Sequence, residues 1–298
     1  MMVWNRLLAF VEAIRPRQWT KNLLAFAAIL FAKKLTDPLS LTNAYIAFGG
    51  LCLAAGACYL VNDVADAERD GRHPEKASRP VASGRLSPAA ATVGALVMML
   101  AAVAAALTAN SDLGLCVAIY IVLQIAYTFS LKQVVVLDVL AVALGFVLRA
   151  VAGAVAIQVE ISPWLLVCTL LLSLFLAIGK RRGELQMLDE EAATHREALG
   201  EYSPYLLDQM TSVVTSATVM AYCLYTFSER TVHDLGTTDL KYTIPFVIYG
   251  IFRYLYLVHK RGLGADPSQL LLSDRPLLAS VILWALVAAV VLYLPRAA

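Results

Sequence analysis

The chain has 298 residues, of which 60% are hydrophobic and 15% are charged, and its mean hydropathy is +0.70. Soluble domains carry about 25% charged residues, so this composition indicates an integral membrane protein. The formal net charge is only +2, and no Lys- and Arg-rich tract of the nucleic-acid-binding type occurs, which argues against a nucleic-acid partner.

Apolar runs of roughly 17–22 residues are long enough to cross a bilayer as helices. They predict an all-α integral membrane protein with about nine transmembrane helices, in which residues 1–298 form a single polytopic domain. Lys33 and Lys34 make the first of these runs the weakest. The expected spans, in chain order, are 19–35, 43–61, 89–109, 113–131, 135–157, 163–179, 211–228, 242–258 and 277–294.

Basic residues set the expected orientation, because cytoplasmic connections are enriched in Lys and Arg. Most of them flank one side of the predicted spans, the side that holds the N-terminus and the two long connections 62–88 and 180–210. We therefore predict a multi-pass protein of the plasma (inner) membrane with a cytoplasmic N-terminus. Long connections are often functional, so the active site is expected on the cytoplasmic side.

The stretch CYLVNDVADAERDGRHPEKASRP begins at the end of the second predicted span. If that helix continues through Asp70, an arc of about 100° carries Asn62, Asp63, Asp66 and Asp70. Like charges at this spacing repel one another, which predicts a bound cation. Mg²⁺ is typically held by one or two carboxylates, with substrate phosphates completing its ligands. We predict Mg²⁺ on Asp66 and Asp70, with Asn62 and Asp63 as further ligands or directly behind them; a solvated acidic loop is the alternative.

Four later features are compatible with more than one role. Asp138 and Arg149 lie about 16 Å apart along nearly one helix face. A charge inside a span is a functional hypothesis by default, but a structural ion pair is equally compatible with Arg149. Glu184 is compatible with binding a ribose hydroxyl or supporting a residue that contacts the substrate, and equally with being a solvated charge at the surface. Tyr127 suits a pocket wall or an aromatic belt at the membrane interface.

Four segments carry a resemblance to a known family. NDVADAERD (62–70), followed by KASRPVASGRLS, resembles the first aspartate motif of the UbiA superfamily of intramembrane prenyltransferases. YTFSLKQVVVLDVLAVALGFVLRAVAGA (127–154) resembles the same superfamily. More narrowly, RPRQWTKNLLAFA (15–27) and SLFLAIGKRRGEL (173–185) resemble its decaprenyl-phosphate phosphoribosyltransferase branch. The resemblance extends over nearly the whole chain.

The resemblance implies a UbiA-like bundle of nine helices with a cavity that opens to the cytoplasm. It implies Mg²⁺-dependent transfer of 5-phosphoribose from phosphoribosyl diphosphate (PRPP) to a polyprenyl (decaprenyl) phosphate, with release of diphosphate. In actinobacteria this reaction supplies the arabinan donor of the cell wall. Asp63, Asp66 and Asp70 would be catalytic.

A donor and an acceptor with three anionic groups between them require many cations, although each basic residue alone could equally anchor the protein at the membrane surface. The residues expected to bind phosphates or ribose are Arg17, Lys21, Lys76, Arg79, Tyr127, Lys132, Asp138, Lys180, Arg181, Arg182 and Glu184.

One departure from the superfamily pattern bears on the substrate. Typical members carry a second D-x-x-x-D motif after the sixth span, whereas here neither Asp189 nor Asp208 begins one. The alternative function, an aromatic-acceptor prenyltransferase of the same superfamily, would need that motif. A transporter would need polar residues midway along several spans. The sequence leaves the polyprenyl chain length and the formation of a homo-oligomer open.

Overall fold

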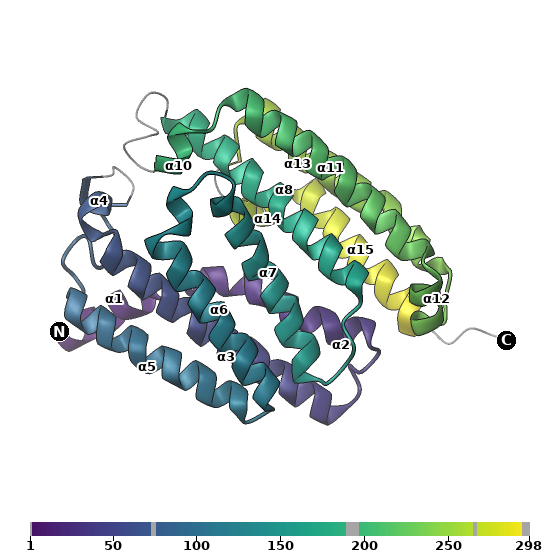
Figure 1. Ribbon diagram of the computed structural model, residues 1–298, viewed down its shortest axis with the longest axis horizontal. Coiled ribbons are helices and arrows are strands. Elements are labelled where there is room, and N and C mark those ends of the chain that lie inside the picture. Colours follow the sequence, from purple (N-terminus) through teal and green to yellow (C-terminus); the bar gives the residue numbers. More distant parts are fainter. Residues whose placement is uncertain (1, 73–75, 189–196, 265–266, 294–298) are drawn as a thin grey trace. The chain divides into compact units, whose positions relative to one another are not determined.

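The computed structural model describes residues 2–72, 76–188, 197–264 and 267–293, and every regular element in these residues is a helix (Figure 1). The chain forms two compact units. Unit 1 comprises Met1–Ile29, Leu35–Lys132 and Leu148–Glu160, and unit 2 comprises Leu30–Lys34, Gln133–Val147 and Ile161–Ala298. The all-helical fold class is confirmed, and a single polytopic domain over 1–298 stays a prediction.

The helices are divided between the two units as follows. Unit 1 holds α1 (Met2–Ala13), η1 (Pro16–Phe26), α3 (Pro38–Ala65), α4 (Ala67–Arg72), α5 (Pro88–Leu107) and α6 (Ser111–Phe129). Unit 2 holds α8 (Pro163–Leu188), α10 (Glu197–Gly200), α11 (Pro204–Phe227), α12 (Glu229–Leu235), η4 (Asp239–Thr243), α13 (Ile244–Arg261), α14 (Pro267–Ser273) and α15 (Arg275–Tyr293). Residues of both units occur in α2 (Ala27–Phe31), η2 (Leu131–Gln133) and α7 (Leu137–Ala156).

Within the described residues, seven helices are long and apolar enough to cross a membrane: α3, α5, α6, α7, α8, α11 and α15. They coincide with seven of the nine predicted spans. At 19–35 the structure has η1 followed by the five-residue α2. At 242–258 it has α13, whose 18 residues include three basic side chains besides His259. Both segments also hold a polar side chain that bonds within its own unit, Asn22 to Arg149 and Arg253 to Asp274, which a count of apolar residues does not reveal.

Four spans begin at the same local signal, a short polar side chain that caps the helix. The caps are Asp37, Ser87, Asn110 and Ser203. Each accepts a hydrogen bond of 2.7–3.3 Å from the backbone N–H three residues later, which satisfies one of the free donors of the first turn. Three of the four are followed by proline, which favours the first helical position because it needs no N–H partner there.

Small side chains let the helices of unit 1 approach one another closely. The face of α5 that packs on α3 buries Ala91, Ala95, Ala102 and Ala106 almost completely, and α6 packs on both helices (Figure 1). The closest approach is at Gly153 of α7, where an added Cβ would lie 1.9 Å from a backbone oxygen of η1. Only glycine allows this contact, so Gly153 fixes how η1 lies against the end of α7.

In unit 2, α8 packs on α11 and α13 packs on α15. Phe175 and Tyr254 form the centre of one hydrophobic cluster, with ring centroids 5.0 Å apart. The hydroxyls of Thr211 and Thr218 on α11 donate 2.7 Å hydrogen bonds to carbonyls one turn earlier. These polar side chains therefore sit in the apolar environment without unsatisfied donors.

Candidate active site

The helix that carries the aspartates does not run unbroken through Asp70. α3 ends at Ala65, Asp66 adopts φ −99° and ψ 4°, and the chain resumes as α4. Backbone hydrogen bonds from Asp66 N to Asn62 O (2.9 Å) and from Asp70 N to Asp66 O (2.8 Å) bridge this break. The helix is therefore interrupted at Asp66, which departs from the assumption of one continuous helix through Asp70; aspartate is a weak helix former, and carboxylates one turn apart repel one another.

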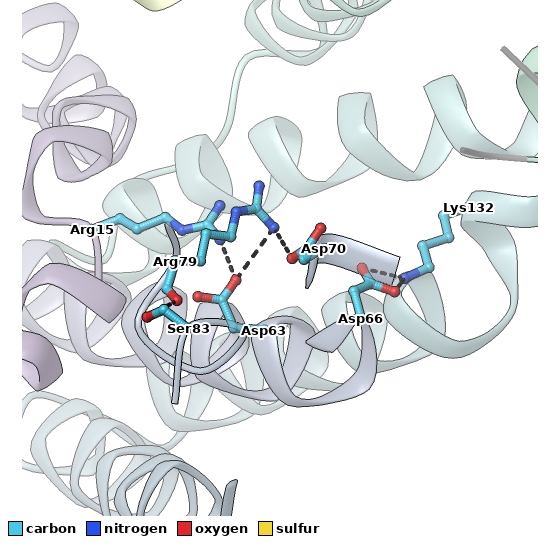
Figure 2. A network of polar contacts seen from close by, with 7 residues as sticks. All are labelled: Arg15, Asp63, Asp66, Asp70, Arg79, Ser83 and Lys132. Carbon is cyan, nitrogen blue, oxygen red and sulfur yellow. Dashed lines mark hydrogen bonds and ion pairs between the residues drawn. The ribbon is translucent and has the colours of Figure 1, made fainter. Parts of the chain in front are cut away.

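Asp63 and Asp70 are brought together around one guanidinium group. Nη1 of Arg79 lies 2.5 Å from Asp70 Oδ2 and 3.5 Å from Asp63 Oδ1. Arg15 donates from its Nη2 to the same Oδ1 of Asp63. Figure 2 shows both carboxylates turned toward these two arginines. Both carboxylates are buried, so the guanidinium groups offset charges that water does not solvate.

Asp66 takes a different partner. Lys132, in the short helix after α6, places its Nζ 2.7 and 2.8 Å from the two carboxylate oxygens of Asp66 (Figure 2). The Lys132 side chain is only 6% exposed, so its charge depends on this partner. We call the six residues Asp63, Asp66, Asp70, Arg15, Arg79 and Lys132 the acidic cap. Its three carboxylates are balanced by three cations.

Arg15 was not among the residues that the sequence pattern singled out. It precedes Pro16 and adopts a left-handed conformation, with φ 52° and ψ 63°, at the start of η1. Such a conformation in a non-glycine residue costs on the order of 1–3 kcal/mol and is often found at functional sites. It directs the side chain to Asp63, whereas Arg17, which was predicted to bind phosphate, is exposed. Nothing in the spacing of RPR distinguishes the two arginines; only the backbone conformation does.

The carboxylates suit a magnesium ion that takes some of its ligands from the protein and the others from a substrate. Oδ2 of Asp63 is buried and has no hydrogen-bond partner in the described part of the chain. A carboxylate oxygen in this state is costly to bury, and it is the type of ligand that Mg²⁺ prefers. The residues that the structure describes contain no group of three His, Cys, Asp or Glu side chains that could hold a metal alone. The cap therefore suits an ion whose other ligands are phosphate oxygens and water.

The other cap-side residues predicted from sequence lie in different parts of unit 1. Lys21 in η1 and Tyr127 near the end of α6 are half-buried, as is Lys76, which precedes Arg79 in the connection after α4. Their predicted roles in binding phosphate stay predictions.

Arg149 is the centre of a buried polar cluster in unit 1. Its Nε donates to Asn22 Oδ1 at 2.8 Å, and its Nη2 donates to Tyr120 Oη at 2.7 Å. Asn22 in turn donates to Cys52 Sγ at 3.3 Å. The guanidinium group thereby links η1, α6 and α7, and this supports a structural role. Neither Asn22 nor Tyr120 was predicted, because each is unremarkable within an apolar run.

In unit 2, Arg181 of α8 is almost fully buried between two carboxylates. Its Nε lies 2.5 Å from Asp138 Oδ2, and its Nη1 lies 2.6 Å from Glu184 Oε2. Tyr202 donates to the other oxygen of Asp138 at 2.7 Å and accepts from Val136 N at 2.8 Å. Burial, together with the hydrogen bond to Asp138, raises the pKa of Tyr202, so the phenol keeps the proton that it donates. Arg181 thus binds both Asp138 and Glu184. All three residues were predicted to bind substrate.

The neighbouring basic residues of α8 are more open. Lys180 is half-exposed, with its Nζ 3.7 Å from Glu184 Oε1. Arg182 donates to Asp208 Oδ1 at 3.0 Å, and His259 Nε2 lies 3.3 Å from the same oxygen. Asp189, the other aspartate of the connection 180–210, lies outside the described residues. Lys180 and Arg182 are therefore more accessible to an anionic ligand than Arg181 is.

The fold and the cap define a class: an all-helical, multi-pass membrane protein with a charge-balanced carboxylate cluster where one span ends. Residues 23–273 match the UbiA prenyltransferase family. The chain is 36% identical over 295 residues to the decaprenyl-phosphate phosphoribosyltransferase of Mycolicibacterium smegmatis, covering 94% of this chain and 91% of that protein. It is 35% identical to the enzyme of the same description from Corynebacterium glutamicum, covering 92% and 83%.

A solved structure agrees on the fold. A UbiA homolog from Archaeoglobus fulgidus, bound to GPP and Mg²⁺, superposes with a TM-score of 0.75 at 18% identity, covering 96% of this chain and 100% of that one. The chain belongs to the UbiA prenyltransferase family. This confirms the resemblance inferred from the aspartate motif and from the segments 15–27 and 173–185.

Proposed function

We propose that this protein transfers 5-phosphoribose from PRPP to decaprenyl phosphate and releases diphosphate. The observation that carries the proposal is the similarity to decaprenyl-phosphate phosphoribosyltransferases along nearly the full length of both chains. The acidic cap supports it, because it combines carboxylates suited to a metal–diphosphate with cations suited to phosphate oxygens.

The reaction breaks the bond from C1 of the ribose to the diphosphate oxygen and forms one from C1 to an oxygen of the lipid phosphate. The acceptor is already an anion, so no general base is needed. In the proposed mechanism Asp63 and Asp70 would hold Mg²⁺, in place of the predicted pair Asp66 and Asp70, because Asp63 has a buried oxygen without a partner in the described residues whereas Lys132 bonds to both oxygens of Asp66. Asp66 and Asn62 would lie beside the ion. Bound Mg²⁺ would neutralise charge on the departing diphosphate. Arg79 and Lys132 orient phosphate oxygens and stabilise the charge that develops on them.

The basic residues of α8 support a second phosphate-binding site in unit 2, in addition to the acidic cap of unit 1. A prenyl-diphosphate enzyme would need a second carboxylate motif after the sixth predicted span, and there this chain has Lys180, Arg181 and Arg182 instead. We assign the more open Lys180 and Arg182 to phosphate binding. Arg181 positions them through its buried bonds to Asp138 and Glu184.

The assay that tests this function uses purified protein in detergent with radiolabelled PRPP and decaprenyl phosphate. We expect a phosphoribosylated lipid and diphosphate in equal amounts, and EDTA should abolish the reaction because the cap alone does not neutralise a diphosphate. The same preparation should transfer nothing from a prenyl diphosphate to 4-hydroxybenzoate. Prenyl transfer without phosphoribosyl transfer would replace the proposed function by that of an aromatic-acceptor prenyltransferase.

We also propose that the N-terminus and the connections 62–88 and 180–210 are cytoplasmic, as the distribution of Lys and Arg predicts. A cysteine at Ser78, in an otherwise cysteine-free chain, should react only with reagents that enter the cytoplasm. A cysteine at His233, whose side chain is 90% exposed in the connection between the predicted spans 211–228 and 242–258, which the same orientation places outside, should react with an impermeant maleimide added to intact cells. The opposite labelling would invert the orientation. Thr194, a second position expected inside, lies outside the described residues.

A further inference from the structure

Arg15 is the partly exposed partner of the buried carboxylate of Asp63. Its guanidinium group bonds to Oδ1 of this carboxylate, whereas Oδ2 is buried without a partner in the described residues. The Asp63 side chain is 1% exposed, and that of Arg15 is 27% exposed. Arg15 is thus closer to solvent than the carboxylate that it neutralises. A cation that binds Asp63 would have to share this carboxylate with the charge of Arg15.

We propose that Arg15 is a positioning residue that makes metal binding depend on the diphosphate. In the ligand-free protein it neutralises Asp63, and when a metal–diphosphate binds it transfers its hydrogen bonds from the carboxylate to a phosphate oxygen. The inference rests on the proposed function only in taking a metal–diphosphate as the ligand of the acidic cap.

Electrostatics explains why the two ligands must bind together. A divalent cation arriving alone would meet the guanidinium groups of Arg15 and Arg79, both directed at Asp63, in a site where burial weakens solvent screening. A cation that carries a diphosphate brings negative charge for these groups to bind. Arg15 then exchanges the carboxylate of Asp63 for a phosphate oxygen, so its positive charge stays paired with a negative charge throughout.

The local structure suits Arg15, rather than Arg79, to this exchange. Arg79 bridges Asp63 and Asp70, so its release would free two carboxylates at once. Arg15 contacts only Asp63 of the cap, and its guanidinium carbon also lies 4.9 Å from the ring centroid of Tyr59, one helical turn before Asp63. The aromatic face gives the cation a second favourable contact close to the carboxylate. The left-handed backbone at Arg15 keeps the side chain at this place.

The test measures Mn²⁺ binding to the purified full-length protein by electron paramagnetic resonance, with no substrate present. Arg15→Gln should bind Mn²⁺ alone about tenfold more tightly than the wild type, because one opposing charge is gone. By thermodynamic linkage, the factor by which Mn²⁺ strengthens binding of labelled pyrophosphate equals the ratio of the Mn²⁺ affinities with and without pyrophosphate. It should therefore fall by about tenfold or more, because the variant binds Mn²⁺ alone more tightly and lacks the contact of Arg15 with the phosphate oxygen. A merely structural role of Arg15 would not tighten metal binding.

Arg72→Gln is the matched control, because Arg72 on α4 carries the same charge near the cap but pairs with Glu68 and is 78% exposed. It should change the Mn²⁺ affinity less than about twofold, since solvent screens its charge. Mn²⁺ affinity unchanged or weakened in Arg15→Gln, or equally tightened in both variants, would overturn the proposal.

If Arg15→Gln does not fold, Arg15→Lys serves as the second variant. It keeps the charge but loses the forked donor, so it should leave the affinity for Mn²⁺ near that of the wild type and weaken pyrophosphate binding in the presence of Mn²⁺. Tighter Mn²⁺ binding in this variant would contradict the proposal. None of these measurements needs phosphoribosyl transfer, so a failure of the proposed reaction and a failure of this inference are distinguishable.

Discussion

Asp70→Asn should lower turnover by at least about a hundredfold while the protein still inserts into the membrane and folds. The substitution keeps the size of the side chain but removes a charge that both Arg79 and the proposed metal need. Asp70 lies in the short helix α4 after the break at Asp66, outside the apolar part of α3. Turnover is measured with PRPP and decaprenyl phosphate, and folding by thermal unfolding in detergent.

Glu68→Gln provides the control on the same short helix. Glu68 pairs with Arg72 at the surface, with a side chain that is 84% exposed, so its loss should leave turnover within about twofold of the wild type. Asp66→Asn should also abolish turnover, and in addition lower the melting temperature, because Lys132 would stay buried without its carboxylate. Full activity in Asp70→Asn and Asp66→Asn would show that the acidic cap does not hold the metal–diphosphate.

Asp138→Ala should destabilise the protein by about 3–5 kcal/mol, the largest effect on stability that we expect from a single substitution. Asp138 and Arg181 are almost completely inaccessible, and in the described residues the substitution leaves the guanidinium group with Glu184 as its carboxylate partner. Tyr202 would also lose its acceptor. The free energy of unfolding is measured by titration with SDS in mixed micelles.

The half-buried pair Arg182–Asp208 is the control for this buried pair. Asp208→Ala should change the free energy of unfolding by less than Asp138→Ala does, on the order of 1 kcal/mol, because the Asp208 side chain is 39% exposed and solvent screens its charge. Equal stabilities of Asp138→Ala and Asp208→Ala would mean that the Asp138–Arg181 pair does not support the fold of unit 2.

A double substitution then separates stability from substrate binding. Asp138→Leu combined with Arg181→Met should regain much of the lost stability, because apolar side chains of similar volume replace a buried ion pair well. If Arg181 acts only by holding α8 in place, and the repacked apolar pair does the same, the double variant should bind PRPP with a dissociation constant within a few fold of the wild type. Restored stability with no PRPP binding would instead make Arg181 itself a phosphate ligand.

The long apolar helices and the carboxylate motif were predictable from the sequence, since both depend on local properties. A bilayer about 30 Å thick demands an uninterrupted apolar run, and seven such runs became helices at the expected places, three of them (α3, α8 and α11) longer than predicted. Capping residues such as Ser87 and Ser203 mark where two of them begin. Carboxylates at the end of a span are too costly to be incidental, so the sequence also indicated where the cap lies.

Tertiary structure alone decided which charges meet. Asp63 and Asp70 lie on opposite sides of a helix break and share Arg79, a residue in the following connection that helical spacing alone does not identify as their partner. Arg15, 48 residues before Asp63, reaches it through a left-handed backbone that no spacing rule predicts.

The same holds for Arg181 in unit 2. As part of KRR it has the composition of a phosphate site, but packing buries it against Asp138, 43 residues earlier in the chain. Hydropathy and helical periodicity indicate whether a segment, or one face of it, requires an apolar or a polar environment. The partner of a buried charge depends instead on distances between segments, because the interaction decays over a few ångströms and desolvation makes an absent partner costly. The sequence therefore determined the membrane fold and the type of its chemistry, and the three-dimensional packing determined which residues carry it out.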